Sequence, residues 1–233
     1  MTENSPLSLD RAKEALSTIT VVKRNVHENS FIAFNSLKEL AESVSQNLDN
    51  FISEKDSRIR VEFKDVSKNE FWLQFGGDLL IFSLHSNVFS FDNSHSLFNT
   101  NYVQENHGRA YFCMIEVFNF LNDSVKFNRY RDVGELVGRV FINSENHFFV
   151  EGMGAVGSLY SDLTTQIFDS KMMNQILETF IVSSIQFDLW APPFQNVRFM
   201  PLANIIEQNG NSPRSTSKRM GYQVSAVSEP DIE

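Results

Sequence analysis

The sequence predicts an α+β fold: a largely antiparallel β-sheet with flanking helices, followed by a disordered C-terminal tail. Segments in the middle of the chain alternate apolar and polar residues, as strands with one solvated face do. Segments near both ends of the body instead have apolar residues at helical spacing. The predicted strands mostly follow one another directly, without the strand–helix alternation of a parallel sheet.

The 233 residues are enough for one domain with a substantial core. No internal repeat and no linker divides the body, so we expect a single domain over residues 1–207. From Gln208 onward the chain is polar, contains Gly, Ser and Pro, and has few apolar residues to bury. Residues 208–233 are therefore predicted to be a flexible tail.

Charge and composition restrict the classes of partner. The net charge of −9 and the pI of about 5.1 argue against sequence-independent nucleic-acid binding, which depends on Lys and Arg. We expect no secretory signal, because the N-terminus lacks a basic start followed by an apolar core, and no membrane span, because no apolar run approaches about 18 residues. These observations favour a cytoplasmic protein.

Two helices are predicted before the sheet. Ser8 can cap a short helix whose apolar face is formed by Leu9, Ala12, Leu16 and Ile19. Residues 21–34 are expected to form a less regular connection. The sequence of residues 36–39 is that of a capping box, in which a hydroxyl and a carboxylate each accept a hydrogen bond from a backbone N–H. The helix that it begins should end at about Ser53.

A meander of strands should follow. Apolar residues alternate over 59–64 and again over 71–75, and Gly76-Gly77 favours a tight hairpin turn with positive φ. Residues 79–84 are predicted to return along the hairpin. A shorter strand is expected at 88–91, before a polar loop.

The second half of the sheet is predicted from two further segments. Residues 109–121 fit both helical and strand spacing, and their aromatic and β-branched content favours a buried strand. Residues 140–142 and 148–150 are expected to form a hairpin around the polar turn 143–146.

A glycine motif comes directly after this hairpin. Gly152, Gly154 and Gly157 match the G-x-G-x-x-G pattern of phosphate-binding loops, in which glycines let the backbone approach a pyrophosphate. A helix is predicted behind them from the spacing of Val156, Leu159, Tyr160, Leu163 and Ile167.

The context of the motif favours a structural role for these glycines. A dinucleotide site needs a parallel strand that ends in an acidic residue about 20 positions later. Residues 171–185 instead read as a helix capped by Asp169 or Ser170, and Asp188 lies too far along the chain. Glu151, just before the motif, would repel a phosphate. An edge strand is expected near the end of the body, at 197–199.

Other candidate sites are weaker. Asp56, Glu62 and Lys64 resemble the acidic and lysine pattern of metal-dependent nucleases, but Glu62 and Lys64 also fit the solvated face of a strand. His107 and Arg109 flank Gly108 and could meet an anionic ligand. The loop residues His85, Asp92 and His95 match no familiar metal-binding spacing, so no metal site is expected.

The single cysteine, Cys113, excludes an intrachain disulfide and a cysteine-based metal cluster, and its apolar neighbours favour a buried, inert thiol. A nucleophilic Cys113 paired with a histidine stays an alternative, although apolar surroundings raise a thiol pKa. The tail residues Arg214, Lys218 and Arg219 form a small basic cluster that could contact an acidic partner.

The sequence favours a non-enzymatic protein that binds a protein partner, itself or a small ligand, with no cofactor. The first alternative is an enzyme or sensor that holds a nucleotide or another phosphate-bearing ligand at the turn 152–157. The second is a metal-dependent nuclease or hydrolase at Glu62 and Lys64. The protein-binding hypothesis predicts an exposed apolar patch larger than a monomer usually carries.

Overall fold

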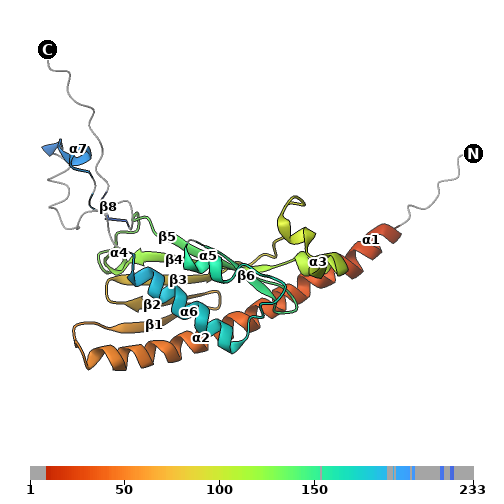
Figure 1. Cartoon of the computed structure of the whole chain (residues 1–233), viewed down its shortest axis with the longest axis horizontal. Coiled ribbons are helices and arrows are strands. Elements are labelled where there is room, and N and C mark those ends of the chain that lie inside the picture. The colour runs from red at the N-terminus through yellow and green to blue at the C-terminus, as the bar shows by residue number, and fades with distance from the viewer. Residues whose placement is uncertain are drawn as a thin grey trace, which may run out of the picture.

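A computed structural model describes residues 9–152, 154–187, 191, 193–199, 201–202, 216–217 and 221–222 of the chain. Its centre is a six-stranded sheet in which the order in space equals the order in sequence and every neighbouring pair is antiparallel (Figure 1). The predicted α+β fold with an antiparallel sheet is confirmed. The strands are β1 Val61–Ser67, β2 Glu70–Phe75, β3 Asp78–Leu84, β4 Cys113–Leu121, β5 Glu135–Ile142 and β6 Phe148–Gly152.

One long helix over residues 10–53 precedes the sheet. It consists of α1 (Asp10–Ala15), a π-helical turn (Leu16–Thr20) and α2 (Val21–Ser53), joined without a break in helical backbone angles. The part from Val26 onward packs on the sheet, whereas α1 and the π-helical turn contain no buried residue. In Figure 1 the start of this helix extends beyond the rest of the molecule.

The prediction of an irregular connection at 21–34 is wrong, and so is the helix start at 36–39. Both ranges lie inside α2. Val26, Ala33 and Phe34 are at most 4% exposed, and their burial against the sheet stabilises the helix through this region. The predicted end at Ser53 is confirmed.

A second helix, α6 (Ser170–Ile185), lies on the same face of the sheet as α2 (Figure 1). Its predicted cap is confirmed, since the carboxylate of Asp169 accepts a hydrogen bond of 2.8 Å from the backbone N–H of Met172. The main core lies between these helices and the sheet, where Phe82 stacks on Phe71 at 4.5 Å and meets Phe180 edge-on at 5.9 Å. The buried residues of α6 recur at helical spacing along one side of the helix and are Met173, Ile176, Leu177, Phe180, Ile181 and Ser184.

The connection between β3 and β4 covers part of the opposite face of the sheet. It contains α3 (Asn101–Glu105) between two 3₁₀ turns, Ser96–Asn99 and His107–Ala110. The predicted strand 88–91 is wrong, because only one bridge forms, between Phe89 and Phe112. The ring of Phe91 instead packs within a second core cluster of Leu97, Val103, Ala110, Phe112, Met114, Phe141, Phe149 and Leu163.

Other predicted boundaries also change. The buried strand predicted at 109–121 is confirmed as β4 and is followed by α4 (Asn122–Lys126). The helix after the glycines, α5, covers only Ala155–Leu159, because Leu163 enters the second core cluster and Ile167 bridges to His147.

The predicted edge strand at 197–199 is wrong, since α7 occupies Phe194–Val197. Most of the predicted tail lies outside the described residues, which include the paired strands β7 (Thr216–Ser217) and β8 (Gly221–Tyr222). Among the described segments, no helix has the length and apolar character required to cross a membrane.

Candidate functional site

Two of the three motif glycines are required by close packing. Gly152 ends β6 and Gly157 lies in α5, and a Cβ added at Gly157 would come within 2.2 Å of the carbonyl oxygen of Gly152. A Cβ at Gly152 would meet Val156 at 2.5 Å. Only Gly154, with φ +57°, is open to solvent at its Cβ position. The pattern thus lets α5 pack against the β5–β6 hairpin.

A cavity of about 430 Å³ lies beside Gly154. The side chain of Asn119 lines it, is 1% exposed, and has an oxygen without a hydrogen-bond partner among the described residues. Glu135 also lines this cavity. The other lining residues are Leu136, Val137, Ala155, Val156, Ser183, Ser184, Gln186 and Phe187.

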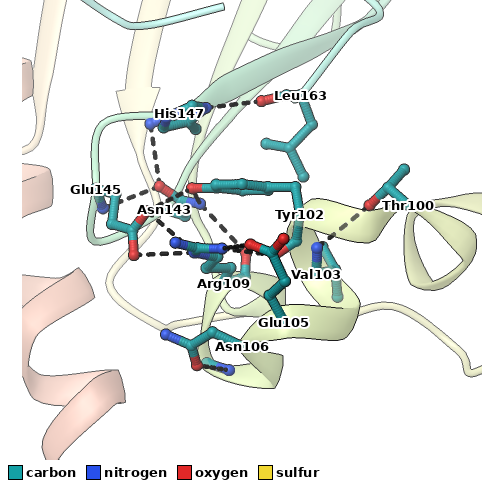
Figure 2. A network of polar contacts seen from close by, with 11 residues as sticks. Thr100, Tyr102, Val103, Glu105, Asn106, Arg109, Asn143, Glu145, His147 and Leu163 are labelled. Atoms are coloured by element: carbon teal, nitrogen blue, oxygen red, sulfur yellow. Dashed lines mark hydrogen bonds and ion pairs between the residues drawn. The ribbon is translucent and has the colours of Figure 1, made fainter. Parts of the chain in front are cut away.

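Arg109 belongs to a different site, a polar network between the β3–β4 connection and the β5–β6 turn (Figure 2). Its guanidinium lies 4.3 Å from the centre of the Tyr102 ring and donates hydrogen bonds of 3.0 Å to Glu145 and 3.2 Å to Glu105. The positive charge of Arg109 is therefore already paired with two carboxylates. The neighbouring His107 is exposed, and no hydrogen bond or ring contact joins it to Arg109 among the described residues.

Tyr102 is at the centre of this network. Figure 2 shows its ring against that of His147, and the two centroids are 4.5 Å apart. The Tyr102 hydroxyl donates to Glu145 at 2.9 Å and accepts from Asn143 at 3.0 Å. Burial raises the pKa of Tyr102 to about 12, and the hydrogen bond to Glu145 acts in the same direction.

Glu145 and Asn143 complete the network. Partial burial would by itself raise the pKa of Glu145, but hydrogen bonds from Arg109 and Tyr102 outweigh it and lower that pKa. The side-chain oxygen of Asn143 accepts from the backbone N–H groups of Glu145 and His147, both at 3.0 Å. These contacts hold the turn against α3, which is a structural role.

The other predicted polar residues are spread over the molecule. Lys64 lies over the ring of Trp72 at 4.7 Å, on the face of β1 that bears Glu62, and Asp56 pairs with Arg58 at 2.6 Å. No group of three or more His, Cys, Asp or Glu side chains that could hold a metal occurs in the described part of the chain.

Local hydrogen bonds in their own turns engage the side chains of the loop residues His85, Asp92 and His95. Each accepts a hydrogen bond from a backbone N–H two residues later. Cys113 is buried, and burial raises its pKa to about 12. The predicted basic cluster of Arg214, Lys218 and Arg219 lies outside the described residues.

An apolar groove lies at the C-terminal ends of α2 and α6 and is called here the α2–α6 groove. The protein-binding hypothesis predicts an exposed apolar patch, but the sequence did not predict where it would lie. The volume of the groove is about 430 Å³. Asp78 is its one charged lining residue in the described part of the chain, and Phe51 and Ile185 are 61% and 58% exposed. The remaining lining residues are Leu48, Ile52, Ile59, Val61, Phe75, Gly76, Gly77 and Ile181.

Comparisons with protein-family models, curated proteins and solved structures found no match to this chain. Function is therefore inferred from the geometry of these sites.

Proposed function

We propose that this chain is a non-enzymatic protein-interaction domain whose α2–α6 groove binds the apolar face of an amphipathic helix. The supporting observation is that Phe51, Ile59 and Ile185, each at least 36% exposed, line one continuous apolar groove. Such a concentration of large apolar side chains at one surface site is typical of interaction sites. A groove between two helices suits a helical ligand, which presents apolar side chains three and four residues apart.

The energetics favour burial of this groove. Covering a large apolar side chain contributes about 1.5–3 kcal/mol, and well-packed aromatic anchors dominate many interfaces. Among the described lining residues, Phe51 is the one aromatic side chain that is mostly exposed, so it is the expected anchor. The negative ends of two helix dipoles favour a helix flanked by basic residues.

The surroundings of Cys113 and Arg109, the side chains considered for nucleophilic chemistry and for anion binding, support the non-enzymatic assignment. The Cys113 thiol is buried and its pKa is raised, while the Arg109 guanidinium is paired with carboxylates. A buried free thiol suits the reducing cytoplasm, which we propose as the location. The net charge of −9 supports a protein partner rather than nucleic acid.

The test uses two synthetic amphipathic peptides that share one leucine stripe, one with lysines and the other with glutamates on the polar face. Calorimetry should show that the lysine peptide binds more tightly. Phe51→Asp and Ile185→Asp should each weaken it roughly tenfold or more, because each loses about 1.5–3 kcal/mol of apolar burial. Ile32→Asp is the matched control, since Ile32 is 67% exposed on α2 and lies outside the groove. Absence of binding, or equal binding to all variants, would contradict the proposal.

A second candidate function is small-ligand binding in the cavity beside Gly154. The buried oxygen of Asn119, which has no hydrogen-bond partner among the described residues, favours it, because such an atom costs about 1–3 kcal/mol unless a donor reaches it. The geometry suits a small neutral or cationic molecule with a hydrogen-bond donor.

Native mass spectrometry of the gently purified protein tests this second function. A retained small molecule that is lost in Asn119→Leu would support it, and a phosphate-bearing molecule would instead favour the nucleotide alternative at the glycine turn. A ligand-free protein that Asn119→Leu stabilises would contradict ligand binding, because the polar atom would then be only a cost to folding.

A further inference from the structure

We infer that the cavity beside Gly154 binds a small, flat molecule through a carboxamide group, which pairs with the carboxamide of Asn119. One hydrogen bond would run from the ligand N–H to Oδ1 of Asn119, and the other from Nδ2 of Asn119 to the ligand carbonyl oxygen. This inference rests on the second proposed function, ligand binding in this cavity, and names the chemical class of the ligand.

Asn119 interrupts an apolar pattern on β4. Alternate residues of a strand face the same side, and Cys113, Ile115 and Val117 place apolar side chains in the main core. Asn119 is the next residue in this series and is buried as they are, at 1% exposed. Its oxygen has no hydrogen-bond partner among the described residues. Such an atom lowers the stability of the fold, and a residue that breaks the local pattern at this cost is expected at a functional position.

The backbone beside Asn119 is also irregular. Asn119 pairs with Glu135 across β4 and β5. Two residues further along β5, Val137 forms a β-bulge, an extra residue between consecutive pairs of the ladder. Val137 lines the cavity, and bulges re-aim side chains and are common next to active sites. The sheet therefore departs from regular geometry at the wall of the cavity itself.

The chemistry of the Asn119 side chain selects the ligand group. An asparagine presents an acceptor oxygen and N–H donors side by side, so a ligand carboxamide can form two reciprocal hydrogen bonds with it. A carboxylate has no donor for the buried oxygen. An ammonium group has donors but no acceptor, and the burial of its charge beside a neutral amide is costly. The carboxamide is the group that uses both edges of the side chain.

The walls of the cavity fit a ring-sized molecule. The volume of about 430 Å³ lies near the lower end of the range for ligand sites, roughly 300–1,000 Å³. Leu136, Val156 and Phe187 contribute apolar or aromatic side chains to the lining. Mostly apolar walls with a few polar groups are typical of small-molecule sites. An aromatic carboxamide combines a flat apolar body with the polar edge that Asn119 requires.

Ligand-observed NMR on the full chain tests the chemical class with benzamide, acetophenone, benzoate and benzamidine as probes. Benzamide should bind most tightly. Acetophenone has the same shape and the same carbonyl group but no N–H, so the oxygen of Asn119 stays unpaired and the affinity should fall roughly tenfold or more. Benzoate should bind as weakly for the same reason. Equal binding of benzamide and acetophenone would overturn the inference.

Substitutions place the binding at Asn119. Asn119→Asp removes the N–H donors and adds a negative charge, so it should reverse the preference from benzamide to benzamidine. Asn119→Leu removes both polar groups and should leave benzamide no tighter than acetophenone, which decides the question even if Asn119→Asp does not fold.

Asn69→Leu is the matched control. Asn69 also has a buried oxygen without a hydrogen-bond partner among the described residues, but it does not line this cavity. This variant should bind benzamide as the wild type does. An equal loss of benzamide binding in Asn69→Leu and Asn119→Leu would argue against the contact with Asn119.

The outcomes separate this inference from ligand binding in general. A retained small molecule that is lost in Asn119→Leu but has no carboxamide would overturn the chemical class and leave the second proposed function standing. Tighter binding of benzamidine to the wild type would also overturn the class, because a charged side chain such as Glu135 would then select the ligand. If no probe bound and no molecule were retained, both proposals would fall.

Discussion

Gly157 lies directly against Gly152, so closely that a Cβ on Gly157 would come within 2.2 Å of the Gly152 carbonyl oxygen. Gly157→Ala should therefore destabilise the protein by about 1–3 kcal/mol, the usual cost of overpacking. Gly77→Ala is the matched control, because its Cβ would have no neighbour within 4 Å and its φ is not positive. Urea denaturation measures both, and an equal effect of the two substitutions would argue against the packing role of Gly157.

The ion pair between Lys38 and Asp65 should be asymmetric in its contribution to stability. The side chain of Lys38 is 9% exposed and that of Asp65 is 60% exposed, at 2.6 Å between the charged atoms. Lys38 also donates to the carbonyl oxygen of Ser67. Asp65→Ala should cost about 1–3 kcal/mol, because it leaves a buried ammonium with one partner fewer.

Lys38→Met should cost less than Asp65→Ala, since a neutral side chain of similar shape needs no partner and Asp65 can be solvated. Chemical denaturation of both variants decides the order. Equal losses, or a larger loss for Lys38→Met, would show that the pair stabilises the fold through attraction rather than by satisfying a buried charge.

The polar network around Tyr102 predicts a loss of stability in alkali. The pKa of Tyr102 is raised to about 12 in the folded protein, above its ordinary value of about 10. The stabilising contribution is thus complete below the ordinary tyrosine pKa and is lost as the pH rises from about 10 towards 12. Tyr102→Phe should flatten this part of the stability–pH curve. Ultraviolet titration of the folded wild type should show one late-ionising tyrosine that is absent from Tyr102→Phe.

The same network predicts a loss of stability in acid. The pKa of Glu145 is lowered in the folded protein, so its contribution is present above the ordinary glutamate pKa and disappears as the pH falls through the folded value. Glu145→Gln should reduce the difference in unfolding free energy between neutral and acidic solution. Glu39→Gln, which alters an exposed carboxylate on α2, serves as the control. An unchanged acid dependence in Glu145→Gln would contradict the assigned shift.

Cys113 should react with thiol reagents only when the protein opens. Burial raises its pKa to about 12 and shields its sulfur atom, so the thiolate is scarce and inaccessible. Iodoacetamide should leave the native chain unmodified on the timescale on which it alkylates the chain in urea. Rapid alkylation in the native state would revive the hypothesis of a nucleophilic cysteine.

Local signals made α6 predictable from the sequence. Asp169 caps the helix, and its apolar stripe is long enough to define one face without knowledge of the rest of the fold. The helix start predicted at residues 36–39 was wrong because tertiary packing overrides the local signal there. Their hydrogen-bonding potential favours a helix start, but Phe34 and Leu37 are buried on both sides of Ser36, and tertiary packing extends the helix through them.

The functional surfaces depend on distances between elements, which no sequence pattern encodes. The glycine motif was recognised, but only the 2.2 Å approach of Gly157 to Gly152 explains it. Phe51 lies near the end of α2, and its exposure arises because the sheet and α6 leave that end uncovered. Arg109 was singled out for an anionic ligand, and the carboxylate that it meets is Glu145 of the same chain.

The neighbour-by-neighbour order of the sheet has a consequence for synthesis on the ribosome. Each strand pairs with the strand that precedes it, so every pairing is available as soon as the next segment leaves the exit tunnel. The long helix emerges first and can cover the growing sheet from β1 onward, whereas α6 emerges after β6, the last strand of the six-stranded sheet. Until then, the aromatic surface that Phe180 later covers stays open, and a nascent chain stalled before residue 170 would be a natural substrate for chaperones.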